Sequence, residues 1–312
     1  MPKSAGAGLF MLFFIALGIY FNQGNSSNDD PEVAEETALG QSNSSPESIL
    51  DEELSGAQEF YASSSSTTTD EGAKLYSSLE IPRGGKTHGI RVEHTGFALD
   101  YDTINHTPFW VAWELTSQET RGREKREDEE FLEDLEVPER HAVRPSTYSG
   151  TGYSRGHMCP AGDQKWSKDA MHDSFYMTNM CPQTIELNKT WWDMLERAER
   201  QWARQEGSVY IVCGPIYDGK QKSLKKKFYV GIPNRFFKVI LSTKKGQEKA
   251  LGFIYRNDAS EQYMEETLCT IDQVEKVTGY DFFSNLPDDI ENVVEAHASL
   301  SDWGKLEPYQ FK

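Results

Sequence analysis

Residues 150–163, GTGYSRGHMCPAGD, hold the most specific pattern in the chain. Glycines flank Arg155 and His157 and favour a tight turn, which sets a permanent cation and a titratable imidazole two residues apart. This pairing suits attack on a phosphate group. A lone histidine beside glycine is more often an ordinary loop residue, so a catalytic role for His157 depends on a second motif further along the chain.

That second motif is Thr178–Gln183, followed by a Leu-Asn pair that ends at Asn188. Directly after it, apolar residues with helical spacing predict a helix over residues 191–205. Glu196 and Arg200 are four residues apart and therefore share one face of that helix.

With these motifs in this order, the sequence resembles the DNA/RNA non-specific endonucleases of the ββα-metal, or His-Me finger, superfamily, which includes endonuclease G. The signature of that family is Asp-Arg-Gly-His, an Asn-x-x-Pro-Gln segment, a Leu-Asn pair and a Glu eight residues after that Asn. The matching residues here are Arg155-Gly156-His157, Asn179-Met180-Cys181-Pro182-Gln183, Leu187-Asn188 and Glu196.

The resemblance implies a role for each matched residue. His157 would be the general base that activates water. Asn188 would be the direct protein ligand of a Mg²⁺ ion, or of Mn²⁺ or another divalent cation in its place. Glu196 would hold the water shell of that ion, and Arg155 and Arg200 would stabilise charge in the transition state. The expected products carry 5′-phosphate and 3′-hydroxyl ends.

Two positions depart from the family pattern. Ser154 stands where the family has Asp, so a hydroxyl replaces that carboxylate. An upstream arginine that the family uses near the substrate has no assigned match, since three arginines precede Phe131 in no fixed register. These three are Arg121, Arg123 and Arg126.

Simpler roles stay open for several residues. Asn188 could cap the helix that follows it, and Glu196 and Arg200 could form a surface pair. Three tryptophans of the same segment are expected in the core rather than stacked on bases. They are Trp191, Trp192 and Trp202.

Two further groups bear on substrate binding and stability. The lysine-rich run 220–227 is either a solvated loop or a contact to phosphate backbone, and its substrate-binding candidates are Lys225, Lys226 and Lys227. In an exported chain Cys159 and Cys181 could form a disulfide that braces the site. The alternative is two buried thiols, which is also what we expect for Cys213.

From Leu79 onward, short β-branched and aromatic runs alternate with turn residues. They predict strands over residues 96–101, 109–115, 208–212 and 236–241, and helices over 191–205 and 271–278. The class is α+β, in one domain of residues 76–312. Together with the resemblance this predicts a ββα-metal nuclease core on a mixed, mainly antiparallel sheet with flanking helices.

Charge and hydropathy set the first 75 residues apart. The 312 residues include 32 Lys plus Arg and 50 Asp plus Glu, a net charge of −18, and thirteen of the acids lie in residues 1–80 against two basic residues. The apolar stretch Ala5–Phe21 behind Lys3 predicts a signal peptide or N-terminal membrane anchor within residues 1–28. Residues 29–75, rich in Ser, Thr and acids, predict a disordered tether. We therefore expect export: a domain that is secreted, periplasmic or anchored outside the cytoplasm.

The sequence as a whole predicts an exported, Mg²⁺-dependent endonuclease that hydrolyses DNA and RNA with little sequence preference. Its partners would be nucleic acids, a membrane only through residues 1–28, and a second copy if it forms a homodimer. The alternatives are a surface-tethered nucleic-acid-binding module that has lost cleavage and a phosphodiesterase for smaller nucleotides. A structural zinc site is disfavoured, because the four cysteines form no CxxC pair.

Overall fold

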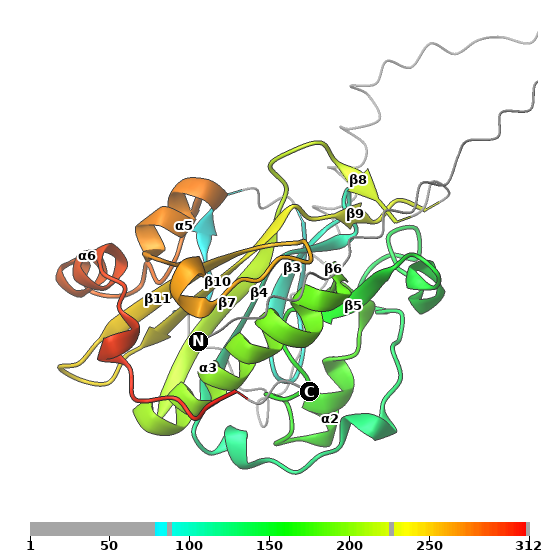
Figure 1. Ribbon diagram of the computed structural model, residues 1–312. Helices are drawn as coiled ribbons and strands as arrows, with labels where there is room; N and C mark the ends of the chain where they lie inside the picture. Colours follow the sequence, from blue (N-terminus) through cyan, green and yellow to red (C-terminus); the bar gives the residue numbers. More distant parts are fainter. Residues whose placement is uncertain (1–78, 86–88, 225–227, 310–312) are drawn as a thin grey trace, which may run out of the picture. The chain divides into compact units, whose positions relative to one another are not determined.

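The computed structural model describes residues 79–85, 89–224 and 228–309 (Figure 1), which belong to one compact unit, Tyr61–Lys312. The predicted N-terminal segment 1–28, the tether 29–75 and the domain boundary at residue 76 lie outside the described residues. Among the helices that the structure does describe, none combines the length and the apolar character that crossing a bilayer requires.

The unit is built on a seven-stranded antiparallel sheet with the strand order β12-β11-β10-β7-β4-β3-β2. The strands are β2 Ile90–Glu93, β3 Ala98–Asp102, β4 Thr107–Thr116, β7 Ser208–Ile216, β10 Arg235–Ser242, β11 Lys249–Arg256 and β12 Leu268–Cys269. The interior strand β10 reads RFFKVILS, and seven of its eight residues are buried. Such a run is expected where both faces of a sheet are covered.

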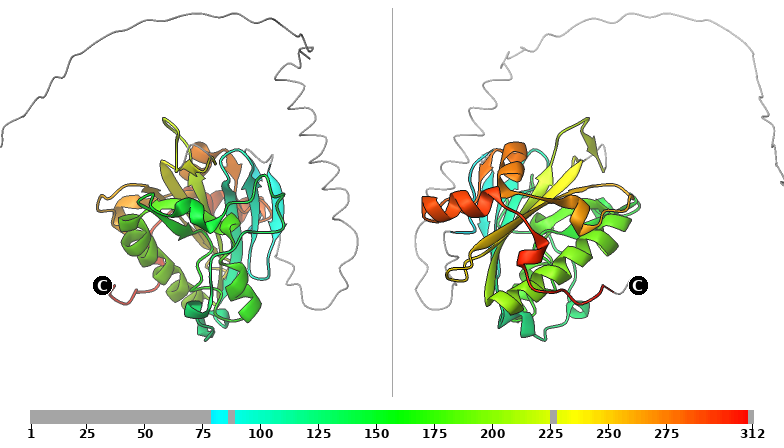
Figure 2. Two further views of the ribbon diagram at one scale, coloured as in Figure 1. Left: turned by 90° about the vertical axis from the view of Figure 1, so that its right-hand side faces the viewer. Right: turned by 60° about the vertical axis from the view of Figure 1, so that its left-hand side comes forward.

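Helices cover the sheet on both faces (Figures 1 and 2). Alternation along β4 turns Trp113 toward α3, Trp192–Glu206, on one face. It turns Trp110 toward the other face, where α5, Ile271–Thr278, and α6, Asp288–Ala296, pack. The fold is therefore a sheet between two helical layers, and the expected α+β class with a mainly antiparallel sheet is confirmed.

The remaining elements are short. The paired strands are β1 Arg83–Gly84 with β13 Tyr280–Asp281, β5 Tyr153–His157 with β6 Met180–Thr184, and β8 Lys222–Ser223 with β9 Gly231–Ile232. The short α-helices are α2 Lys168–Asp173 and α4 Met264–Thr267. The 3₁₀ segments are η1 Glu119–Arg121, η2 Arg126–Asp128, η3 Pro145–Tyr148, η4 Met177–Asn179 and η6 Leu300–Asp302, and η5, Leu187–Trp191, is a π-helical turn.

The predicted elements are found, with shifts at their ends. Strand β7 continues through Gly214 and Pro215, beyond the predicted end at residue 212. Pairing with β4 stops at Cys213, so Pro215 has only β10 as a neighbour and its missing N–H costs no ladder bond there. Gly214 is needed at this point, since a Cβ would lie 2.5 Å from the carbonyl oxygen of Phe109.

Candidate active site

The site is built on the strand pair β5–β6 and the helix α3, in the order strand, strand, helix (Figure 1). Because side chains alternate along a strand, Arg155 and His157 point to one face of β5. Both line a cavity of about 990 Å³. Gly156 points the other way, onto Gln183 of β6, where a Cβ would lie 2.0 Å from the Gln183 Oε1.

Two contacts fix this unit. The buried Asn179 side chain accepts a hydrogen bond from the Cys159 N–H (2.9 Å) and donates to the carbonyl oxygens of Cys159 (2.8 Å) and Ser174 (2.9 Å). It thereby clamps the chain just after β5 onto the start of β6. On the helix side, the Trp192 indole donates to the His157 carbonyl oxygen at 3.2 Å, which ties α3 to the histidine strand.

The cavity brings together four residues predicted from separate motifs. His157 and Arg155 come from β5, Asn188 from the π-helical turn, and Glu196 from α3. Arg126 also lines it. All of these are side chains that can bind, stabilise or act on a phosphate group.

His157 is buried between aromatic rings. Its imidazole packs against Phe175, with ring centroids 5.1 Å apart, and against Phe131 at 5.6 Å. Its Nε2 atom is buried and has no hydrogen-bond partner within the described residues. Burial, with the positive charge of Arg126 as a smaller cause, lowers the pKa of His157 to about 3. The ring is therefore neutral at physiological pH, as a general base must be.

Among the described residues, Arg155 is held by a carbonyl oxygen and an aromatic ring and not by a carboxylate. Its Nε and Nη2 donate to the Pro145 carbonyl oxygen at 3.2 and 2.8 Å, and its guanidinium lies 4.9 Å from the ring centroid of Phe131. These contacts use one edge of the fork. Donors on the remaining nitrogen are left for an anion in the cavity.

Asn188 lies in the π-helical turn, one residue after its start. It therefore does not cap the helix, and that alternative is wrong: Trp191 occupies the N-cap position of α3, with no side-chain cap. The π turn connects β6 to α3 by continuous helix, so the chain has no non-helical cap residue there. Single π turns often occur at functional sites.

Glu196 faces the same cavity from one turn into α3, and it is partly buried. Burial raises its pKa to about 7, although Lys238 and Arg200 act in the opposite direction. Neither Glu196 nor Asn188 forms a side-chain hydrogen bond or ion pair within the described residues. Both therefore offer oxygen atoms to a ligand.

Arg200 is the predicted site residue that the structure places elsewhere. Its Nη1 donates to the Asp163 Oδ1 at 2.7 Å, and Asp163 is fully buried and also accepts from the Trp113 indole at 3.1 Å. Arg200 is not among the residues that line the His157 cavity but lines a neighbouring depression. The surface-pair alternative does not describe it either, since its partner is Asp163 rather than Glu196.

Sequence reasoning missed a buried ion pair beneath the site. Lys238 Nζ lies 2.8 Å from Glu199 Oε2, and both side chains are fully buried between β10 and α3. The Lys238 ammonium also lies 4.6 Å from the ring centroid of Trp192. A lysine inside an otherwise apolar strand, RFFKVILS, was the signal available in the sequence.

The predictions for lysines and cysteines have separate outcomes. Lys225, Lys226 and Lys227 lie outside the described residues. The disulfide is wrong, because Cys159 and Cys181 are free buried thiols, as Cys213 is too. Cys181 pairs with Gly156 inside the β5–β6 ladder, whereas Cys159 lies beyond it and its Sγ accepts from Gln164 at 3.0 Å.

The expectation that Trp191, Trp192 and Trp202 are core residues is confirmed.

Comparison with known proteins agrees with this geometry. A model of the DNA/RNA non-specific endonuclease family matches residues 81–289. Human mitochondrial endonuclease G is 32% identical over 202 residues, which cover 61% of this chain and 68% of that protein. The chain belongs to the DNA/RNA non-specific endonuclease family. Members of this family of nucleic-acid hydrolases depend on a divalent metal ion.

Other similar proteins are only partly covered. The mitochondrial nuclease EXOG of Xenopus laevis is 32% identical over 211 residues, which are 63% of this chain and 59% of that protein. The chain thus spans about three fifths of that relative. A solved structure titled as an EndoG/EndoGI complex has a TM-score of 0.62 at 23% identity and covers 72% of this chain and 96% of that chain. It shows that the fold is shared.

The names of the relatives overturn the expectation of export. The Xenopus EXOG, human endonuclease G and Saccharomyces cerevisiae proteins are all named as mitochondrial nucleases. A secreted, periplasmic or externally anchored domain is therefore wrong. The pattern that suggested it, an apolar stretch free of acids behind Lys3, does not identify one compartment, since mitochondrial targeting segments are also poor in acids.

Ser154, which replaces the Asp of the endonuclease-family pattern, lies on the face of β5 that points away from the cavity. Ser154 pairs with Gln183 in the ladder and is not among the residues that line the cavity. Since Arg155 and His157 face the cavity, alternation turns residue 154 away from it. A hydroxyl there leaves the groups inside the cavity unchanged.

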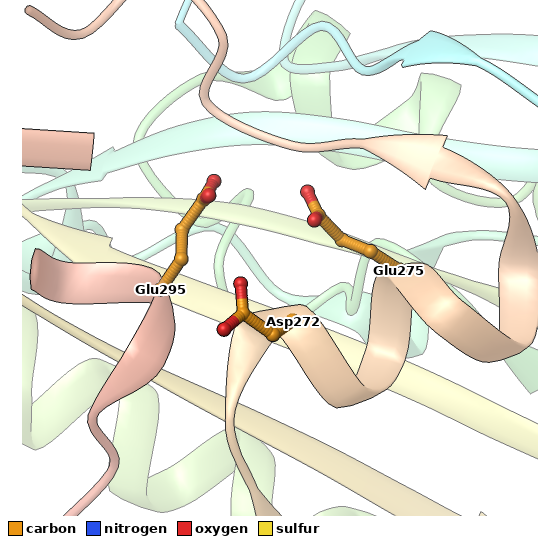
Figure 3. Close-up of side chains that lie close together, drawn as sticks. All are labelled: Asp272, Glu275 and Glu295. Carbon is orange, nitrogen blue, oxygen red and sulfur yellow. The ribbon is translucent and has the colours of Figure 1, made fainter. Parts of the chain in front are cut away.

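Within the described residues, a separate acidic cluster lies between α5 and α6 (Figure 3). Asp272, Glu275 and Glu295 have carboxylate oxygens within 4.8 Å of one another. Glu295 is buried, and its Oε1 has no hydrogen-bond partner among those residues. Burial, with Glu275 and other nearby acids adding to it, raises the pKa of Glu295 to about 8. We infer that repulsion between these carboxylates destabilises the folded state as pH rises and Glu295 loses its proton.

Replacing Glu295 with glutamine is expected to raise the free energy of unfolding by roughly 2 to 4 kcal/mol at pH 8, since each unit of pKa shift is worth about 1.4 kcal/mol, and to have little effect at pH 4. Between its ordinary pKa and about 8, Glu295 keeps a proton in the folded state that the unfolded state has lost, so the wild type loses stability as pH rises. Urea unfolding at both pH values measures this. The exposed Asp289→Asn is the matched control, and equal pH dependence in all three proteins would contradict the assignment.

Proposed function

We propose that this protein is a Mg²⁺-dependent endonuclease that hydrolyses phosphodiester bonds of DNA and RNA with little sequence preference. The observation that carries the proposal is the convergence of His157, Asn188, Glu196 and two arginines in one cavity of the ββα unit. Their polar atoms suit the phosphate group, which every nucleotide shares, and contacts to phosphate carry no sequence information.

The residues present fit a Mg²⁺ ion. The amide oxygen of Asn188 and the carboxylate of Glu196 are the hard oxygen donors that Mg²⁺ prefers, and Mg²⁺ commonly keeps several waters. Glu196 stands in the cavity without a direct cationic partner within the described residues, and its pKa is raised to about 7. In this proposal Asn188 holds the ion and Glu196 its waters. A bound ion would supply positive charge that offsets the negative charge developing on the phosphate during cleavage.

The chain itself performs the proton transfer and the binding. The neutral His157 takes a proton from the attacking water, which its low pKa and its place in the cavity lining support. Arg155, oriented by the Pro145 carbonyl, donates to the non-bridging phosphate oxygens. Arg126 faces the same cavity and adds a second cation for the phosphate. Attack by water with loss of the 3′-oxygen leaves 5′-phosphate and 3′-hydroxyl ends.

In this proposal Arg200 acts on the reaction indirectly. Its ion pair with Asp163 joins α3, which carries Glu196, to the segment that directly follows His157 and strand β5. We propose that it fixes their relative position, while its charge also favours the ionised form of Glu196.

The ends of the products test the reaction. The full chain is incubated in Mg²⁺ with supercoiled plasmid and, separately, with a structured RNA. We expect both to be cut, and the DNA fragments to be joined by a ligase without prior kinase treatment. Cleavage of short nucleotides but not of plasmid would favour the phosphodiesterase alternative instead.

Replacing Asn188 with alanine is expected to raise the Mg²⁺ concentration needed for half-maximal cleavage by at least about 10-fold, the size of effect seen when a metal site loses a supporting group. Asn188→Asp keeps an oxygen donor and should retain most of the affinity. A Mg²⁺ titration of cleavage rate compares them. An unchanged Mg²⁺ requirement in Asn188→Ala would remove Asn188 from the metal site.

The acid limb of kcat/KM is expected to belong to Glu196 rather than to His157. Glu196, with a pKa of about 7, is protonated as pH falls below 7, whereas His157 stays neutral to about pH 3. Protons and Mg²⁺ compete for the Glu196 site, so the limb should move to lower pH as Mg²⁺ is raised. An acid limb of kcat/KM near pH 6.5 whose position does not change with Mg²⁺ concentration would indicate a titrating histidine.

For location we propose mitochondria, since the similar nucleases bear that name. The full chain with a C-terminal fluorescent protein should coincide with a mitochondrial stain in cells. A diffuse cytosolic signal would count against the proposal.

A further inference from the structure

A second depression of about 690 Å³ lies beside the active-site cavity. The two share Gly162 and Tyr309 as lining residues, so they are neighbours on the surface. One wall is formed by the loops that carry Gly122 and Lys165. The floor is the outer face of α3 from residue 194 to residue 204, and the other wall is the C-terminal segment Leu306–Tyr309. We call this depression the α3 groove.

The α3 groove is positively charged, in contrast to the chain as a whole. Its lining includes four cationic side chains and one acid, Glu307, in a protein with a net charge of −18. The cations are Lys165, Arg197, Arg200 and Arg204. Two of them are already paired, Arg197 with Asp193 and Arg200 with Asp163. Lys165 and Arg204 are exposed and form no ion pair within the described part of the chain.

The first wall is held rigidly. The Glu124 N–H donates to the Lys165 carbonyl oxygen at 3.0 Å. Gly122 packs so closely on the same peptide group that a Cβ would lie 2.1 Å from the Lys165 carbonyl oxygen. Lys165 therefore starts from a fixed backbone position, and only its side chain must be ordered when an anion binds.

The second wall is fixed to α3 by side-chain contacts. The Gln201 Oε1 accepts from the Glu307 N–H at 2.7 Å, and the Tyr309 hydroxyl donates to Asp193 Oδ2 at 3.0 Å. The Arg197 guanidinium lies 5.4 Å from the ring centroid of Tyr309. The groove is thus formed before any ligand binds, which lowers the entropic cost of binding.

We propose that the α3 groove binds the phosphodiester backbone of the nucleic-acid strand that continues beyond the scissile phosphate. The inference rests on the proposed endonuclease function, because it needs a strand whose reacting phosphate lies at His157. Arg204 is eight residues beyond Glu196 on α3, a distance of about 12 Å along the helix axis, against a rise of about 3.4 Å per nucleotide in a duplex. Lys165 and Arg204 thus contact phosphates a few nucleotides away from the cleaved bond.

Binding is tested in EDTA, so that no cleavage intervenes, with a fluorescein-labelled 20-nucleotide single-stranded DNA and the full chain. Lys165→Gln with Arg204→Gln is compared with Lys244→Gln with Lys245→Gln, which removes the same charge at the exposed β10–β11 turn. We expect about 10-fold weaker binding for the groove variant only. Its plot of log affinity against log salt should be less steep by about 1.4, for two lost phosphate contacts at about 0.7 each.

Cleavage provides the second measurement. For the groove variant KM should rise for a 20-nucleotide substrate, while kcat/KM for a trinucleotide should match the wild type. If both variants bind and cleave alike, the groove assignment is wrong although the nuclease stands. If the wild type cleaves nothing, the proposed function fails, and the EDTA titration still decides whether the groove binds DNA. Equal displacement of the DNA by polyglutamate of the same charge would identify an acidic peptide as the occupant and overturn the proposal.

Discussion

Replacing His157 with alanine is expected to lower kcat for plasmid cleavage by about 10²- to 10⁴-fold, the usual contribution of a positioned general base. The residue lines the same cavity as Arg155, Asn188 and Glu196, and its ring is neutral at physiological pH. Among the described residues, no other histidine lines that cavity. Single-turnover cleavage with enzyme in excess measures the step without interference from product release.

The control for this variant is His297→Ala, which removes an exposed histidine that does not line the cavity. It should cleave at the wild-type rate. Because His157 is buried, its removal also opens space next to Phe175, so the free energy of unfolding of each variant must be measured beside its rate. A stable His157→Ala protein that cleaves within threefold of wild type would exclude His157 as the base.

Replacing Lys238 with methionine is expected to lower the free energy of unfolding by about 3 to 5 kcal/mol, because it leaves Glu199 fully buried without its partner, so that the carboxylate must stay charged in the core or take up a proton there. Glu199 is fully buried, and its second oxygen, Oε1, has no partner in the described structure. The loss of the ammonium also removes its contact with the Trp192 ring. Urea unfolding followed by tryptophan fluorescence measures the effect.

The double variant Lys238→Met with Glu199→Met tests whether the loss comes from the unpaired charge. Two apolar side chains of similar length remove both buried charges, so most of the lost stability should return. The exposed Lys244→Met provides a control that should change stability by less than about 0.5 kcal/mol. If Lys238→Met alone cost under 1 kcal/mol, the pair would not be the support for α3 that its geometry indicates.

The elements that could be predicted from the sequence are those whose signals are local. Helix α5 runs over Ile271–Thr278 as predicted, because Thr270 and Gln273 form a capping box and Gly279 adopts the left-handed conformation that ends a helix. Strand β4 was predicted from its aromatic and β-branched run. It pairs with β3 on one side and with β7 on the other.

The site was predictable as far as the motifs reach. The spacing of His157, Asn188 and Glu196 matched a family pattern, and the structure places all three in one cavity. Arg126 could not be matched to the family pattern from the sequence. It lies in a short 3₁₀ segment, which has no periodic sequence pattern, and it lines the cavity.

The remaining differences come from contacts between distant residues. Arg200 was predicted to stabilise the transition state, with a surface pair to Glu196 as the simpler alternative, but its ion pair is with Asp163, 37 positions earlier. Lys238 and Glu199 lie 39 positions apart and meet only when α3 packs on β10. The disulfide failed for the same kind of reason: Cys159 and Cys181 share the motif segments in sequence, yet in space one thiol belongs to the ladder and the other packs on Gln164.

The measurement that tests the central claim most directly is the conversion of supercoiled plasmid by the full wild-type chain in Mg²⁺, in excess EDTA, and after Mg²⁺ is restored. The account predicts nicked and then linear DNA in Mg²⁺, none in EDTA, and recovery of cleavage when the ion returns. Plasmid that stays supercoiled in Mg²⁺ but is retained in a salt-sensitive complex would contradict it and indicate a nucleic-acid-binding module that does not cleave.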